Sequence, residues 1–232
     1  PEDIKPFAHT IRKQALRLVT LTEDIIQLSQ LEETKPESIS FEEVNLAQIA
    51  ERCAESLEMN ARAKNVSITL NTEDCYINGN TSLLEELVYN LIDNAIRYNK
   101  ENGSVKIKTI NRSIIVSDTG IGIPKKYQSR IFERFFRVDK SRSKETGGTG
   151  LGLAIVKQLV DLMQGQITVK SKKHVGTEFN IILPFEEVQQ EQITEEETQA
   201  VRSYTSEQLS LEGKKILNVD DNAMNREIVE YM

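Results

Sequence analysis

The apolar positions of the chain switch between helical and strand-like spacing. From Phe7 to Leu31 they recur at three- and four-residue steps, which predicts a long helix with one apolar stripe that needs a partner. A linker with Pro36 follows at Lys35–Phe41, and further helices are expected at Val44–Lys64, 81–99 and 151–163. Short runs predict strands, at Val66–Leu70, Val105–Ile110, Ser113–Ser117, Gln166–Ser171 and Glu178–Leu183. This interleaving favours a mixed sheet with its helices on one side, which is a two-layer α/β sandwich.

The character of the sequence changes beyond Pro184. Glu186–Gly213 is rich in Glu, Gln and Thr, a composition typical of a solvated linker. Lys214–Asn222 then has a strand-like run that ends in an acidic pair, and a helix is expected at Met224–Met232. The expected segments are therefore a helix at 1–35, a compact domain at 36–185, a linker at 186–213 and the start of another domain at 214–232.

Composition narrows the class of protein. The chain is 38% hydrophobic and 28% charged, and its net charge is −7, which disfavours a general nucleic-acid binder. No apolar run approaches the ~20 residues that a membrane-spanning helix needs, and no signal peptide precedes the first helix. Cys53 and Cys75 lack metal-like spacing, so we expect reduced structural thiols. We expect a soluble, cytoplasmic fragment without direct membrane contact, which still permits a membrane-anchored sensor in the full-length protein.

Candidate chemistry begins with two amides in the helix predicted at 81–99. Asn90 and Asn94 are four residues apart, so both project from one helix face and can hold a cation and phosphate oxygens. Amide oxygens suit Mg²⁺, which prefers oxygen ligands. A core helix whose two Asn pair internally remains the alternative for this motif taken alone.

Two glycine-containing stretches add to this pattern. Asp118 ends a predicted strand before Gly120 and Gly122, so its carboxylate can accept a hydrogen bond from an exocyclic amine while backbone approaches a ligand. An ordinary turn is the alternative. The loop 147–152, GGTGLG, runs directly into a predicted helix, whose N-terminus can face phosphate. No Lys-Ser/Thr follows that loop, so it is not a Walker A loop.

A basic run lies between these two glycine stretches. Its cations are suited to neutralise a triphosphate, although a solvated loop is the alternative. The run comprises Lys125, Lys126, Arg130, Arg134, Arg137, Lys140, Arg142 and Lys144.

In this order, these stretches resemble the ATP-binding domain of sensor histidine kinases, in the GHKL superfamily, over residues 40–185. Asn90 and Asn94 match the N box, Asp118 to Gly122 the G1 box, 132–136 the F box and 148–152 the G2 box. The resemblance implies the GHKL (Bergerat) α/β sandwich and binding of ATP with Mg²⁺. Asn90 would coordinate Mg²⁺, Asn94 would contact phosphates, and Asp118 would read the adenine amine. The basic run would be a mobile ATP lid anchored by the F-box aromatics, and its closure would exclude water.

The full set of ATP-binding residues that this resemblance implies combines the four boxes with the lid and the last strand. It comprises Asn90, Asn94, Arg97, Tyr98, Asp118, Gly120, Gly122, Ile123, Phe132, Arg137, Gly148, Thr149, Gly150, Leu151, Gly152 and Thr177.

The first helix resembles the second helix of the dimerisation and phosphotransfer hairpin of histidine kinases, which forms a two-chain four-helix bundle. His9 does not fit the phosphoacceptor, because Thr10 and not an acidic residue follows it, and because it lies too close to the N box. His174 lies in an expected strand connection. The acceptor helix is therefore expected to be missing, and the fragment is expected not to phosphorylate itself.

The C-terminal segment resembles the start of a response-regulator receiver, as appended to hybrid histidine kinases. Asp220 and Asp221 would then help to hold Mg²⁺ in that domain. Taken together, the sequence predicts the catalytic part of a two-component kinase that transfers the γ-phosphate of ATP to a histidine and onward to a receiver aspartate. The full-length protein would be a homodimer. The alternatives are a non-catalytic docking module and another GHKL ATPase or serine kinase.

Overall fold

The computed structural model describes residues 4–138 and 148–184, which lie within the first of two compact units, Pro1–Glu186. A long helix, α1 (Ile4–Glu33), precedes three further helices, α2 (Leu46–Ala63), α3 (Thr81–Arg97) and α5 (Gly152–Leu162). The strands are β1 (Glu42–Asn45), β2 (Ser67–Thr72), β3 (Tyr76–Gly79), β4 (Ser104–Ile110), β5 (Ser113–Asp118), β6 (Gln166–Lys172) and β7 (Gly176–Ile182), and short 3₁₀ turns occupy Pro36–Ser38 and Lys125–Tyr127. The linker at 186–213 and the receiver-like segment with Asp220 and Asp221 lie outside the described residues.

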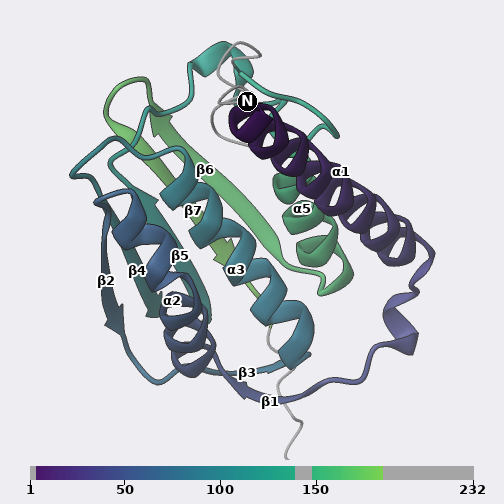
Figure 1. Ribbon diagram of the computed structural model, residues 1–232. Coiled ribbons are helices and arrows are strands. Elements are labelled where there is room, and N and C mark those ends of the chain that lie inside the picture. The colour runs from purple at the N-terminus through teal and green to yellow at the C-terminus, as the bar shows by residue number, and fades with distance from the viewer. Residues whose placement is uncertain (1–3, 139–147, 185–232) are drawn as a thin grey trace, which may run out of the picture. The chain divides into compact units, whose positions relative to one another are not determined.

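Five strands form one mixed sheet in the order β2-β4-β5-β7-β6. Only β2 and β4 run parallel, and the other neighbours are antiparallel. Helices α2, α3 and α5 cover one face of this sheet (Figure 1), so the predicted two-layer α/β sandwich is confirmed. The register pairs Asp118 at the end of β5 with Thr177 near the start of β7, which places two predicted site residues side by side.

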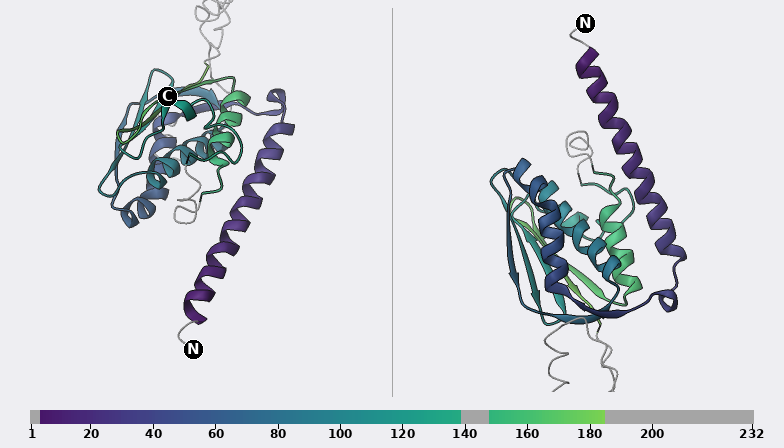
Figure 2. Two further views of the ribbon diagram at one scale, coloured as in Figure 1. Left: turned by 90° about the horizontal axis from the view of Figure 1, so that it is seen from above. Right: turned by 60° about the horizontal axis from the view of Figure 1, so that its bottom comes forward.

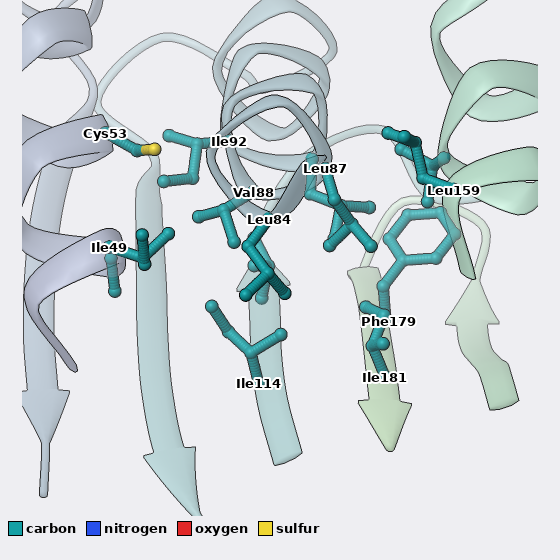
Figure 3. Close-up of a cluster of buried hydrophobic side chains, with 14 of the residues drawn as sticks. Ile49, Cys53, Leu84, Leu87, Val88, Ile92, Ile114, Leu159, Phe179 and Ile181 are labelled. Carbon is teal, nitrogen blue, oxygen red and sulfur yellow. The ribbon is translucent and has the colours of Figure 1, made fainter. Parts of the chain in front are cut away.

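Apolar side chains of α3 form the centre of the core. Leu84, Leu87 and Val88 are fully buried between the sheet and the helices on either side (Figure 3). This face repeats at helical spacing, whereas the polar residues of α3 lie on the opposite side. Both cysteines are buried and free, as expected, and burial raises the pKa of the Cys53 thiol to about 11. Core packing on this face therefore holds α3 in place, so that the residues on its polar side are presented to the site.

The two short strands β1 and β3 are not foreseen from the sequence, and the helix predicted from Val44 begins only at Leu46. Asn45 explains the boundary, because its Oδ1 accepts hydrogen bonds from the backbone N–H of Ala47 (3.0 Å) and of Cys75 (3.3 Å). Its Nδ2 donates to Asp74 Oδ1 at 2.7 Å. One side chain thus caps α2 and holds it to the segment before β3.

Replacing Asn45 by Ala is expected to lower the free energy of unfolding by about 2 kcal/mol, because a helix cap is lost and a buried N–H is left without its acceptor. Urea denaturation measures the change. Asn71→Ala, at an exposed position of β2, is the matched control and should stay close to the wild type. Equal stabilities for the two variants would contradict the capping role.

Helix α1 packs along the outer side of α5 (Figures 1 and 2). Leu28 and Leu31 are buried there, Glu32 forms an ion pair with Arg134, and the Leu31 carbonyl accepts from Gln158 Nε2 at 3.5 Å. The predicted apolar stripe is therefore only partly covered, since several apolar residues of α1 remain exposed, namely Phe7, Ile11, Leu16, Leu18, Val19, Ile25 and Ile26. Within residues 4–138 and 148–184, no helix combines the length and apolar character needed to cross a membrane.

Candidate nucleotide-binding site

A cavity of about 740 Å³ opens between α3, the loops after β5 and before α5, and the overhanging α1. It collects most of the residues that the sequence predicts for ATP binding, although these come from segments far apart in the chain. Those that line it are Asn90, Asn94, Arg97, Tyr98, Asp118, Gly122, Ile123, Arg137, Gly148, Thr149, Gly150, Gly152 and Thr177.

Three predicted residues do not line the cavity. Leu151 is fully buried in the core as the residue before α5, and Phe132 packs edge-on against Phe179 with ring centroids 6.5 Å apart. Gly120 lies behind the site, where an added Cβ would approach the Tyr98 carbonyl oxygen to 2.4 Å. These three residues support the wall of the cavity and do not form its surface.

The two N-box amides face the start of α5. Asn90 Nδ2 donates to the Glu86 carbonyl one turn earlier at 3.0 Å, which leaves its Oδ1 directed towards the glycine loop. A Cβ added at Gly152 would lie 3.0 Å from Asn90 Oδ1 and 3.4 Å from Asn94 Nδ2, so the absence of a side chain here keeps this space open. An oxygen and amide donors therefore converge beside a helix N-terminus, the arrangement that suits a cation with phosphate.

Asp118 is the most strongly perturbed acid in the cavity. Burial raises the pKa of its carboxyl group to about 6, although hydrogen bonds from the backbone of Gly120 and Thr177 act in the opposite direction. The Gly120 N–H donates to Oδ1 at 2.7 Å. A carboxylate that is held by backbone donors and partly shielded from water is poised to accept one further hydrogen bond from a ligand.

The C-terminal end of α3 forms another wall. Arg97 is held by Asp93 through an ion pair of 2.7 Å, and Lys64, the residue that follows α2, donates to the Arg97 carbonyl and to that of Ile96. The lysine thus occupies the free carbonyls of the helix end, where a cation also interacts favourably with the helix dipole. Lys64 is not predicted from the sequence, because the strands β2 and β3 separate the end of α2 from the end of α3 along the chain.

The segment before the undescribed residues 139–147 is fixed to the glycine loop. Arg137 Nη1 donates to the Gly148 carbonyl at 2.5 Å, and the Phe135 N–H donates to the Gly150 carbonyl at 3.0 Å. Phe136 packs against Tyr127 with ring centroids 5.8 Å apart, and the guanidinium of Arg130 lies over its ring. Phe132 and Phe136 thus anchor this segment in the core, while Phe135 is exposed.

Only part of the predicted basic run lies at the cavity. Arg130 pairs with Glu133 and Arg134 pairs with Glu32, and neither of them lines the cavity. Lys125 and Lys126 form a 3₁₀ turn outside it. Among the described members of the run, Arg137 alone lines the cavity. Lys140, Arg142 and Lys144 lie outside the described residues.

The most unexpected contribution comes from α1. Asp24 accepts a hydrogen bond from the hydroxyl of Thr149, in the middle of the glycine loop, at 2.5 Å. Burial raises the pKa of the Asp24 carboxyl group. The helix adds further residues to the cavity lining, namely Lys13, Gln14, Leu16, Arg17 and Thr20. The one signal in the sequence is their spacing along a single face of the predicted helix.

The fold and this site define the class. Residues 79–187 match the family of histidine kinase-, DNA gyrase B- and HSP90-like ATPases, so this part of the chain is a GHKL domain of the histidine kinase type. Sensor histidine kinase RppB of Synechocystis sp. is 40% identical over 188 residues, covering 78% of this chain and 41% of that protein. Sensor-like histidine kinase SenX3 of Mycolicibacterium smegmatis is 36% identical over 191 residues, covering 79% and 49%.

A solved structure, full-length ShkA in complex with AMPPNP, superposes with a TM-score of 0.64 at 26% identity, covering 78% of this chain and 38% of that one. The chain spans less than half the length of the two curated relatives named above. Because those relatives are histidine kinases, the two-component class is favoured over the other GHKL enzymes considered from the sequence.

Proposed function

We propose that the chain binds Mg·ATP in this cavity and presents the γ-phosphate to a histidine side chain, from which the phosphoryl group passes to a response-regulator aspartate. The observation that carries the proposal is the meeting of the Asn90–Asn94 pair, the Asp118 carboxylate and the glycine loop around one cavity. The complex of ShkA with AMPPNP, a nucleotide, supports it by analogy.

Each residue has a role that its surroundings support. Asp118 accepts a hydrogen bond from the adenine amine, because backbone donors already fix its orientation. The loop Gly148–Gly152 and the N-terminus of α5 receive the phosphates with Asn94 and Arg137. Arg97 and Tyr98 line the phosphate and base sides.

Asn90 is proposed as the protein ligand of Mg²⁺. In the described parts of the chain, no group of three His, Cys, Asp or Glu side chains is arranged to hold a metal ion. The Oδ1 atom of Asn90 is directed into the cavity, so a metal held by this amide and by nucleotide phosphates fits the residues present. When bound, Mg²⁺ would neutralise charge on the phosphate oxygens.

In the reaction, a nitrogen of the acceptor imidazole forms a bond to the γ-phosphorus while the bond to the β–γ bridging oxygen breaks. ADP leaves with the electron pair, and the imidazole loses its ring proton to solvent. Phosphoryl transfer asks mainly for alignment and charge neutralisation. The cavity supplies both through the glycine loop and Arg137, so no protein base in this domain is required.

The acceptor histidine is proposed to lie outside residues 1–232. The chain has two histidines, and His174 lies in the β6–β7 connection, where its backbone N–H donates to the Ile121 carbonyl. His9 lies within α1, which we propose is the second helix of a dimerisation hairpin. The exposed apolar residues of α1 would then pack in a homodimeric four-helix bundle. The proposed partners are this second copy and a receiver domain, to which 214–232 would contribute, and the proposed location is the cytoplasm.

Titration with Mg·ATP by calorimetry tests the function. We expect saturable micromolar binding, at least tenfold weaker for Asn90→Ala in the presence of Mg²⁺, because the metal loses its protein ligand. Omitting Mg²⁺ should reduce the difference in ATP affinity between the wild type and Asn90→Ala. With γ-labelled ATP the chain alone should acquire no acid-labile label. Absence of binding would favour a docking module without ATP, and label on His9 would contradict the external acceptor.

A further inference from the structure

The face of α1 that looks toward the catalytic domain changes its chemical character along the helix. Towards its C-terminal end the face is apolar, and Leu28 and Leu31 are buried against α5. Towards its N-terminal end the same face is basic and lines the nucleotide cavity with Lys13 and Arg17. Among the described side chains from Phe7 to Thr20, Arg17 is the only one that is partly buried.

Three contacts fix where this basic end lies. Asp24 is bonded to Thr149 of the glycine loop, the Leu31 carbonyl accepts from α5, and Glu32 pairs with Arg134. Arg17 precedes Asp24 by seven residues and so lies on the same helix face, about 10 Å further along the axis. The helix is thereby held in a register that brings the Arg17 side chain over the cavity.

Three cations that line the cavity from outside α1 already have protein partners. Arg97 pairs with Asp93, Lys64 donates to carbonyls at the end of α3, and Arg137 donates to the Gly148 carbonyl. Within the described part of the chain, Arg17 forms no hydrogen bond or ion pair. Its guanidinium therefore keeps all its donors for a ligand, and a planar fork of N–H groups matches a phosphate.

We propose that Arg17 binds the phosphate tail of the nucleotide from α1, so that a helix outside the catalytic domain completes the ATP site. The inference rests on the proposed function, because it presupposes ATP in this cavity. Lys13, one turn earlier, adds a second positive charge on the same side. Nucleotide affinity then depends on where α1 lies, and any movement of this helix changes how firmly the phosphates are held.

The test compares Arg17→Gln with Arg12→Gln in the full chain. Both variants remove one arginine charge from α1, but Arg12 is exposed and does not line the cavity. For Arg17→Gln we expect the Kd of Mg·ATP to rise about ten- to thirtyfold, the lower range for loss of a charge-assisted hydrogen bond, and the Kd of adenosine to stay unchanged. Arg12→Gln should bind both ligands as the wild type does. Arg17→Lys should recover part of the ATP affinity.

The outcomes separate the two levels of the proposal. If the wild-type chain binds no ATP, the proposed function fails, whatever the Arg17 variant does. If the wild type binds ATP and both arginine variants bind it equally, the inference about Arg17 is overturned. Equal weakening of ATP and adenosine would also overturn it, because Arg17 would then act through the fold and not on phosphate. Thermal denaturation of both variants should match the wild type, since neither side chain is in the core.

Discussion

Replacing Asp118 by Asn is expected to weaken ATP binding about 100-fold, the upper range for loss of a hydrogen bond to a charged group. The carboxylate has two oxygens, so it can satisfy the backbone N–H groups of Gly120 and Thr177 and still accept from the adenine amine. Asn offers one oxygen and turns an NH₂ group towards one of these donors. For the same reason, wild-type affinity should fall as the pH drops below about 6, where Asp118 becomes protonated.

The same substitution should make the fold more stable at neutral pH. Burial raises the pKa of Asp118 from 3.8 to about 6, so between these values the folded state binds more protons than the unfolded state. Stability therefore falls as the pH rises through this window, and the cost is fully present above it. Asn removes the charge, and the expected gain is about 1–2 kcal/mol at pH 8, after allowing for weaker backbone hydrogen bonds.

Urea denaturation at pH 8 and pH 4 measures this change in the free energy of unfolding, alongside calorimetry for ATP binding. The gain in stability of Asp118→Asn should vanish at pH 4. Glu101→Gln, at an exposed turn, removes the same charge elsewhere and should change neither property. If Asp118→Asn bound ATP as tightly as the wild type, the proposed contact between Asp118 and the adenine amine would be refuted. Lower stability at pH 8 would show that the hydrogen bonds to the carboxylate outweigh its burial.

Periodicity was sufficient to predict the elements that carry the site. Asn90 and Asn94 lie on one face because one helical turn separates them, and a strand end followed by glycines placed Asp118 correctly. Leu151 shows the limit of such reasoning. It belongs to the glycine loop by position, yet its side chain is buried in the core, because the direction of a loop residue depends on backbone angles that composition does not specify.

The contributions that the sequence did not predict all depend on non-local packing. β1 and β3 are four-residue strands that form only by pairing with each other, and α2 and β2 lie between them in the sequence. Neither strand therefore has a strong local sequence signal. Asp24 reaches Thr149 across 125 positions of the chain. The ion pairs of Arg130 and Arg134 also depend on the fold. They direct these two positive charges away from the cavity, although the basic run in the sequence would assign both to the triphosphate.

Gly176→Ala is expected to lower the free energy of unfolding by about 3 kcal/mol or more, the range of backbone strain combined with overpacking. Gly176 begins β7 with φ of +145°, a conformation that side chains other than glycine rarely adopt. An added Cβ would lie 1.9 Å from the Asp118 carbonyl oxygen and 3.1 Å from Thr119 Cα. Both neighbours are backbone, so no flexible side chain can move aside to relieve the clash.

The strain should also reach the site, because the backbone that must shift belongs to the proposed adenine-reading residue. Any folded Gly176→Ala protein is therefore expected to bind ATP more weakly than the wild type, which calorimetry at low temperature would measure alongside urea denaturation. Gly148→Ala is the comparison for stability, since its Cβ would meet the Tyr98 hydroxyl at 3.2 Å and φ there is not left-handed. It should stay within about 1 kcal/mol of the wild type. If the Gly176 variant were equally stable, β7 would not approach Asp118 so closely.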